Sequence, residues 1–253
     1  MLFIKFFLLL FIYTNIFSAQ YGTIFASSNL RFVFPEMIDV FYKTYPNADV
    51  HIQYEGSGTL AKEILDGKNY DLFLAANMKY PQIIYNNKKA ITPPKVYIQG
   101  KIVLYIPKKF QNDKTLWKVL TQPNIKTIFI ANKKSAPYGV ASIEVLKYYK
   151  IYDKVKHKII YTSDIATAVY KLLWNNEVGF VPKSALLFFA DRDSKNNSID
   201  IDQKAYNPII QGYVFSKEGI KNQNATKFLN FLLSKKGQEI FKKYGYVSPF
   251  KTK

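Results

Sequence analysis

Four short polar segments carry the residues that could do chemistry in this chain. Each stands between a strand-like apolar run and a helix-like run, and they span residues 27–29, 56–59, 135–139 and 162–165. The first-turn N–H groups of a helix have no partner inside the helix, and the helix dipole adds positive potential there. Together with nearby hydroxyl and amide side chains, these junctions predict binding of a small anion by uncharged donors.

Helix capping explains any one of these segments equally well, because Ser, Thr, Asn and Asp are favoured N-caps. Asp164 is interpreted as a cap of its own helix, since a carboxylate turned toward an anion would repel it. The four segments together favour a shared site, because the carboxyl ends of parallel strands gather at one edge of a sheet.

Few residues in this sequence are of the types that carry out catalysis. The chain has no cysteine and two histidines, His51 and His157, which excludes thiolate nucleophiles and cysteine-ligated metals. Residues 56–61 match the G-x-G-x-x-A pattern, but the next strand ends without the acidic residue that a dinucleotide site needs. An exported hydrolase built on Ser57 stays as an alternative, although the sequence places neither histidine beside Ser57.

Charge is the most conspicuous feature of the composition. The 253 residues include 36 Lys and Arg against 18 Asp and Glu, a formal net charge of +18. Only Arg31 and Arg192 are arginine, and the lysines are scattered. Proteins that read nucleic acids favour the bidentate arginine fork. The pattern therefore indicates a solvated lysine surface and no nucleic-acid partner.

Residues 1–19 have the pattern of a secretory signal peptide. Lys5 precedes an apolar run, and the small residues Ser18 and Ala19 stand near the expected cleavage point. An uncleaved membrane anchor is the alternative. We expect a periplasmic protein that is exported through a cleaved leader.

The rest of the chain alternates strand-like and helix-like segments, twice in the order β-α-β-α-β, which is typical of parallel sheets with helical crossovers. The expected strands are residues 21–26, 50–54, 71–75, 126–131, 158–161 and 178–181, and the expected helices are residues 30–45, 59–66, 138–149 and 165–175. Pro35 should kink the first helix or shift its start. The pattern predicts an α/β fold of two similar lobes, each a mainly parallel sheet flanked by helices.

Two β-rich runs, residues 95–107 and 207–216, stand on either side of the second series and predict a two-strand hinge. Two ordinary strands within one domain are the alternative. The expected division gives residues 1–19 to the signal peptide, 20–97 and 208–253 to the first lobe, and 98–207 to the second lobe. Residues 191–197 are expected to form a polar surface loop.

Five runs resemble the periplasmic molybdate-binding proteins of ABC importers, over a range from about Gly22 to Tyr246. The runs are FASSNL at 25–30, SGTLAKEI at 57–64, YDLFLAAN at 70–77, APYGVA at 136–141 and GQEIFKKYG at 237–245. The resemblance implies a periplasmic binding protein fold of the class II type, in which two lobes close over a tetrahedral oxyanion held by neutral hydrogen bonds.

Carried over by position, the resemblance implies five residues that contact the oxyanion through hydroxyl, amide or backbone N–H donors. They are Ser28, Asn29, Ser57, Tyr138 and Ile165. Tyr138 and Ile165 would use their backbone N–H groups, and Ser57 both its hydroxyl and its N–H. Asn29 stands where the family often has serine, and its amide can still donate. Pro182 stands where many members place a tyrosine hydroxyl, and proline has no hydrogen to donate.

The function implied by the resemblance is that of a non-catalytic, monomeric solute-binding protein. It would capture molybdate, and tungstate as well, without a cofactor, and deliver the ligand to a membrane ABC permease. The alternatives are the binding of another small anion, such as sulfate or phosphate, and the exported hydrolase.

Overall fold

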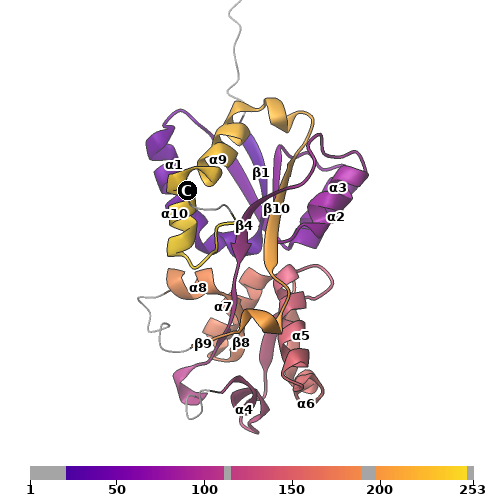
Figure 1. Cartoon of the computed structure of the whole chain (residues 1–253), viewed down its shortest axis with the longest axis vertical. Coiled ribbons are helices and arrows are strands. Elements are labelled where there is room, and N and C mark those ends of the chain that lie inside the picture. Colours follow the sequence, from indigo (N-terminus) through magenta and orange to yellow (C-terminus); the bar gives the residue numbers. More distant parts are fainter. Residues whose placement is uncertain (1–20, 111–114, 190–197, 250–253) are drawn as a thin grey trace, which may run out of the picture.

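Two α/β lobes, each built on a five-stranded sheet, make up the computed structural model, which describes residues 21–110, 115–189 and 198–249 (Figure 1). One lobe holds the segments from both ends of the described chain, and the other holds the middle of the sequence. The predicted leader and the predicted loop at 191–197 lie outside the described residues.

The first sheet has the strand order β2-β1-β3-β10-β4. Its strands are β1 (Gly22–Ser27), β2 (Val50–Glu55), β3 (Leu72–Ala75), β4 (Lys95–Gly100) and β10 (Ile209–Phe215). β1 pairs in parallel with β2 and β3, whereas β10 is antiparallel to both β3 and β4. Only β10 is therefore reversed, and the prediction of a mainly parallel sheet is confirmed.

Helices cover both faces of the first sheet, which explains why every residue of β3 is buried. On one face lie α1 (Phe34–Thr44), α9 (Gln223–Leu233) and α10 (Lys235–Lys243), and on the other lie α2 (Ser57–Leu65) and α3 (Lys79–Asn86). Side chains alternate along a strand, so Leu72 and Leu74 face the first group while Phe73 and Ala75 face the second. The burial of apolar surface on both sides holds the lobe together.

The second sheet repeats this plan with the order β7-β6-β8-β5-β9. Its strands are β5 (Ile102–Tyr105), β6 (Ile128–Ala131), β7 (Ile159–Thr162), β8 (Val178–Pro182) and β9 (Ser198–Asp200). One face packs against α4 (Leu116–Thr121), α5 (Pro137–Tyr148) and α6 (Tyr152–Val155), and the other against α7 (Ile165–Asn175) and α8 (Lys183–Phe188). Again one strand, β5, opposes the others.

Two segments connect the sheets. β4 continues through Lys101 into β5, and the chain returns from β9 through the short 3-10 helix Gln203–Ala205 into β10. β4 and β10 pair with each other, so the outgoing and the returning segment lie side by side (Figure 1). We propose the lobe boundaries at 97/98 and 207/208, which fall within β4 and just before β10.

The helix predicted at residues 30–45 is divided in the structure. A 3-10 helix, Ser28–Phe32, comes first, and α1 begins at Phe34 with Pro35 in its first turn. A proline is tolerated there because the first-turn N–H groups have no partner within the helix. The sequence pattern missed α3, whose only buried residues are Pro81 and Ile84. In the part of the chain that the structure describes, no helix combines the length and the apolar character that crossing a bilayer requires.

Candidate functional site

The structure brings the four polar junctions together across the two lobes. The Gly58 N–H in α2 donates to the Ser135 carbonyl of the second lobe over 2.9 Å. A Cβ on Gly56 would lie 3.7 Å from the Asp164 Cβ, and the Ser28 hydroxyl hydrogen-bonds the Asp164 carboxylate. The junctions at 27–29 and 56–59 thus meet those at 135–139 and 162–165, the convergence that a shared site requires.

All five residues implied by the resemblance are buried in this region: Ser28, Asn29, Ser57, Tyr138 and Ile165. Burial matters because hydrogen bonds to an anion are stronger where water is excluded. It also means that each polar group here must find a partner, since an unsatisfied buried donor costs about 1–3 kcal/mol.

Ser57 is the first residue of α2, and its hydroxyl is held in place by the neighbouring strand. The backbone N–H of Ala76, just past β3, donates to the Ser57 hydroxyl oxygen over 2.9 Å. The oxygen is therefore used as an acceptor, which leaves the hydroxyl hydrogen to be donated. The Ser57 N–H lies in the first turn of α2 and adds a second donor of the same residue.

Tyr138 and Ile165 lie in the first turns of α5 and α7. Their backbone N–H groups have no partner within their own helices. Asp164 is the N-cap of α7, and its side chain accepts from the N–H groups of Ala166 and Thr167 over 2.8 and 3.1 Å. The interpretation of Asp164 as a cap is confirmed. Neither cap bond involves the Ile165 N–H, so this donor is not used by the Asp164 side chain.

The charge of Asp164 is compensated locally. Burial alone would raise the pKa of its carboxyl, but hydrogen bonds from Thr167, Ser163 and Ser28 outweigh burial and hold the pKa below its usual value. The carboxylate therefore stays ionised at neutral pH, and its oxygens are surrounded by donors.

The Asn29 side chain has protein partners on every polar atom. Its carbonyl oxygen accepts from the Ser27 hydroxyl over 2.7 Å, and its amide nitrogen donates to the Gln211 Oε1 over 3.2 Å and to the Tyr246 hydroxyl over 3.0 Å. The amide that was expected to contact the anion is used by the protein itself in this structure. The backbone N–H of Asn29, in the first turn of the 3-10 helix, is the donor that remains.

Sequence reasoning missed four buried polar residues around Asn29: Tyr97, Ser184, Gln211 and Tyr246. The Tyr97 hydroxyl donates to the Gln211 Oε1 over 2.8 Å, and the Tyr246 hydroxyl lies 3.3 Å from the Ser184 Oγ. Gln211 could have been found, because it is a polar residue inside the apolar run of residues 207–216. The tyrosines carry no such signal, since tyrosine is common in this chain.

Pro182 ends β8 and precedes α8, and it is buried. It offers no donor, so the tyrosine contact that the resemblance implies for many members of the family has no counterpart at this position. Ser184, two residues later, is buried beside Tyr246 and not exposed to solvent.

The histidines are remote from Ser57. His51 stacks on Tyr21 with ring centroids 4.0 Å apart at the start of β2, and His157 lies in a 3-10 helix before β7. The structure therefore gives the hydrolase alternative no histidine base beside Ser57. Among the described residues, no group of three or more His, Cys, Asp or Glu side chains could hold a metal ion.

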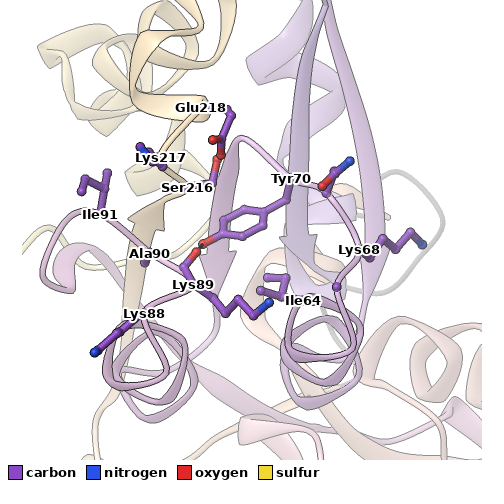
Figure 2. Close-up of a pocket in the computed structure, with 12 residues that line it drawn as sticks. Ile64, Lys68, Tyr70, Lys88, Lys89, Ala90, Ile91, Ser216, Lys217 and Glu218 are labelled. Carbon is purple, nitrogen blue, oxygen red and sulfur yellow. Dashed lines mark hydrogen bonds between the residues drawn. The ribbon is translucent and has the colours of Figure 1, made fainter.

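A separate hollow of about 360 Å³ opens on the first lobe, lined in part by Tyr70, Lys89, Ser216 and Glu218 (Figure 2). None of the five implied residues lines it. Its lysines are exposed, and the Tyr70 hydroxyl donates to the Lys89 carbonyl over 2.7 Å inside the lobe. Exposed lysines bind water well, so this hollow lacks the desolvated donors found at the junctions between the lobes.

The two-lobed fold, with buried neutral donors where the lobes meet, defines a solute-binding protein and not an enzyme. The chain belongs to the family described as bacterial extracellular solute-binding protein, whose model matches residues 23–247. The sequence is 29% identical over 194 residues to the molybdate-binding protein ModA of Rhodobacter capsulatus, with 76% of this chain and 75% of that protein covered. It is 26% identical over 237 residues to ModA of Escherichia coli (strain K12), with 89% and 88% covered.

Among solved structures, the fold is similar to that of the Azotobacter vinelandii periplasmic molybdate-binding protein. The TM-score is 0.80 at 26% sequence identity, over 91% of this chain and all of that one. The resemblance inferred from the sequence runs is therefore confirmed over nearly the whole described chain.

Proposed function

We propose that this protein captures molybdate, and tungstate as well, where its two lobes meet, and delivers it to an ABC permease from the periplasm. The observation that carries the proposal is the meeting of the helix starts of α2, α5 and α7 with the oriented Ser57 hydroxyl in one buried region. The anion would be held by the backbone N–H groups of Ser57, Tyr138 and Ile165, the Ser57 hydroxyl, and the junction at Ser28 and Asn29.

The chemistry suits a dianion. A hydrogen bond from a neutral donor to a charged oxygen contributes about 1.5–3 kcal/mol, so several of them offset the loss of hydration without a buried cation. Neutral donors also release the ligand readily when the lobes separate, because no ion pair must be broken. The strongly positive net charge of the chain acts at long range, by raising the rate at which anions reach the protein.

The family and the relatives support the remaining parts of the proposal. The family is extracellular, and the two relatives described above are named for molybdate. Sulfate and phosphate present the same tetrahedral pattern of oxygens, so these anions are the second candidates, and the size of the closed site would discriminate among them.

Thermal unfolding with an anion panel tests the proposal. Molybdate and tungstate should raise the midpoint temperature, because a ligand that binds only the folded state stabilises it by RT ln(1 + [L]/Kd), about 2.7 kcal/mol at a concentration of 100 Kd. Sulfate and phosphate at equal concentration should raise it less. A chain stabilised by neither molybdate nor tungstate would have another function.

A further inference from the structure

Exposed apolar side chains gather at the outer edge of the second lobe. Strand β7 is the last strand of its sheet, so among the described residues it has a strand neighbour on one side only, and α7 packs against it. Five large side chains of β7, α7 and α8 are exposed, and we call them the aromatic patch: Ile160, Tyr161, Tyr170, Trp174 and Phe188. Single exposed side chains of this kind are common, but a cluster of them marks an interaction site.

The aromatic patch borders a groove of about 820 Å³. Ile160 lines the groove together with Tyr170 and Trp174, which lie four residues apart on α7 and therefore share one face of that helix. Trp174 is 91% exposed, so its indole ring lies almost entirely in water. The rings of Tyr170 and Phe188 both contact the ring of Phe32, with centroids 6.0 Å apart in each pair. These contacts join α7 and α8 into one surface.

The elements around the aromatic patch carry an excess of positive charge. Residues 126–134 and 151–177 hold seven lysines and three acidic residues. Two of the acids, Asp153 and Glu177, are already in ion pairs with lysines, and the third, Asp164, is the buried cap of α7. The exposed surface here therefore presents more ammonium groups than carboxylates, so it attracts an anionic partner.

Two lysines lie directly beside the aromatic side chains. Lys171 lines the groove, and the Lys133 ammonium lies 5.8 Å from the centre of the Tyr161 ring. Tryptophan and tyrosine rings beside lysines are typical of surfaces at the boundary between lipid headgroups and acyl chains, because the ring enters the apolar layer while the ammonium meets a phosphate. A second copy of this chain would bring the same positive charge to the contact, and like charges repel. The charge therefore favours a lipid surface over a second copy.

We propose that the aromatic patch docks the second lobe reversibly on an anionic phospholipid surface, with Trp174 as the main inserted side chain. The net charge of +18 raises the concentration of the protein near such a surface, and the rings hold it there. Docking leaves the proposed anion site free, because Ile165 at the start of α7 lies about 14 Å along the helix from Trp174. A docked protein would stay close to a membrane permease. That consequence rests on the proposed function, whereas lipid binding does not.

Co-sedimentation with lipid vesicles tests the proposal. The protein is purified from the periplasm after export, and its mass is checked so that no leader contributes to lipid binding. Vesicles of phosphatidylglycerol and phosphatidylethanolamine supply an anionic surface, and vesicles of phosphatidylcholine supply a neutral one. We expect the wild type to bind the anionic vesicles about tenfold more tightly than the neutral ones, and added salt to weaken this binding by screening.

Trp174→Ser removes the main inserted side chain and should leave the midpoint of thermal unfolding unchanged, because that side chain lies outside the core. We expect its binding to anionic vesicles to be about tenfold weaker, since the apolar surface that enters the lipid is lost. Tyr170→Ser should weaken binding as well. The matched control is Tyr148→Ser, because Tyr148 is 52% exposed against 50% for Tyr170 but lies on α5, on the opposite face of the sheet. Tyr148→Ser should bind vesicles like the wild type.

Fluorescence reports whether Trp174 itself enters the lipid. The chain has one other tryptophan, Trp117, so the difference between the spectra of the wild type and Trp174→Phe isolates the emission of Trp174. This emission should shift to shorter wavelength when anionic vesicles are added, because the indole leaves water.

A wild type that does not bind the anionic vesicles would overturn the proposal, and so would equal vesicle binding by Trp174→Ser and Tyr148→Ser. A wild type that ignores vesicles but self-associates in sedimentation velocity, with the association lost in Trp174→Ser, would make the aromatic patch an interface between copies and likewise overturn it. If vesicle binding follows the expectations but no oxyanion binds the wild type, lipid docking stands and the proposed function fails.

Discussion

The Ser57 hydroxyl accepts a hydrogen bond of 2.9 Å from the backbone N–H of Ala76, so the start of α2 is tied to the end of β3. Both residues are buried. The bond satisfies a strand-end N–H that would otherwise be unpaired, and at the same time orients a hydroxyl hydrogen for donation. One residue therefore supports the fold and prepares the proposed site.

Ser57→Ala separates these two contributions. We expect molybdate affinity to fall about tenfold or more, because one donor to a charged ligand is lost, and the free energy of unfolding to fall by about 1–3 kcal/mol, because the Ala76 N–H loses its acceptor. Calorimetry and urea denaturation measure the two quantities.

The control for Ser57→Ala is a variant that should lose stability but keep its affinity for the ligand. The Ser234 hydroxyl caps α10 by accepting from the Gly237 N–H over 3.2 Å, far from the junctions, so Ser234→Ala should cost about 1 kcal/mol and leave affinity unchanged. Wild-type affinity in Ser57→Ala would remove the Ser57 hydroxyl from the proposed site.

Asn29 can be tested with two substitutions that differ in charge. Asn29→Ala removes the bonds to Ser27, Gln211 and Tyr246, and we expect a loss of about 2 kcal/mol in stability and a roughly tenfold weaker affinity for molybdate. Asn29→Asp also places a carboxylate beside the anion, so its affinity should fall further and fall more as the pH rises. Equal molybdate affinities for the two variants would show that the side chain at position 29 lies too far from the anion for a carboxylate to repel it.

Gly58→Ala should interfere with closure. A Cβ on Gly58 would lie 2.9 Å from the Ser135 Cα and 2.7 Å from the Tyr80 hydroxyl, and Ser135 belongs to the second lobe. We expect molybdate affinity to fall about tenfold or more while the unfolding free energy of the ligand-free protein changes by less than about 1 kcal/mol, because alanine has the better helix propensity.

A glycine that packs within one lobe is the matched control for Gly58. A Cβ on Gly219 would lie 2.1 Å from the Asp71 carbonyl oxygen of the same lobe. Gly219→Ala should therefore lower the midpoint of urea denaturation, whereas we expect that midpoint to change little in Gly58→Ala. A Gly58→Ala protein that binds molybdate normally would contradict the contact between the lobes.

The Asp164 carboxylate should make stability depend on pH. Its folded-state pKa is held below the unfolded value of about 3.9 by hydrogen bonds that outweigh burial. The stabilising contribution is therefore fully present above that value and is lost as the pH falls through the folded-state pKa. The difference in unfolding free energy between the wild type and Asp164→Asn should shrink as the pH is lowered below about 4.

Thr167→Val provides the companion measurement. It removes the hydroxyl that donates to Asp164 over 2.7 Å, so the folded-state pKa of Asp164 should rise toward the unfolded value. As the pH is lowered, the protein should then begin to lose stability at a higher pH than the wild type does. Denaturation curves from pH 3 to pH 7 check both variants. A pH-independent difference between the wild type and Asp164→Asn would mean that the carboxylate is not stabilised by its charge.

Local patterns predicted much of the architecture. The expected helix at residues 165–175 coincides with α7, and the expected Asp164 cap is present, because a cap and an apolar helix face are specified by residues a few positions apart. Pro35 likewise marked the shifted start of α1. The weakly apolar α3 escaped detection, since tertiary packing of Pro81 and Ile84 supports it more than a strong periodic pattern does.

The sequence by itself determined the composition of the proposed site: helix starts rich in neutral donors, no cysteine and two distant histidines. Only the tertiary structure decided which donors remain available to a ligand. Asn29 gives its amide to Gln211 and Tyr246, which lie 182 and 217 residues further along the chain. Such partners are chosen by how the strands and lobes pack, because a buried polar group must be satisfied by whatever donor or acceptor the fold brings within reach.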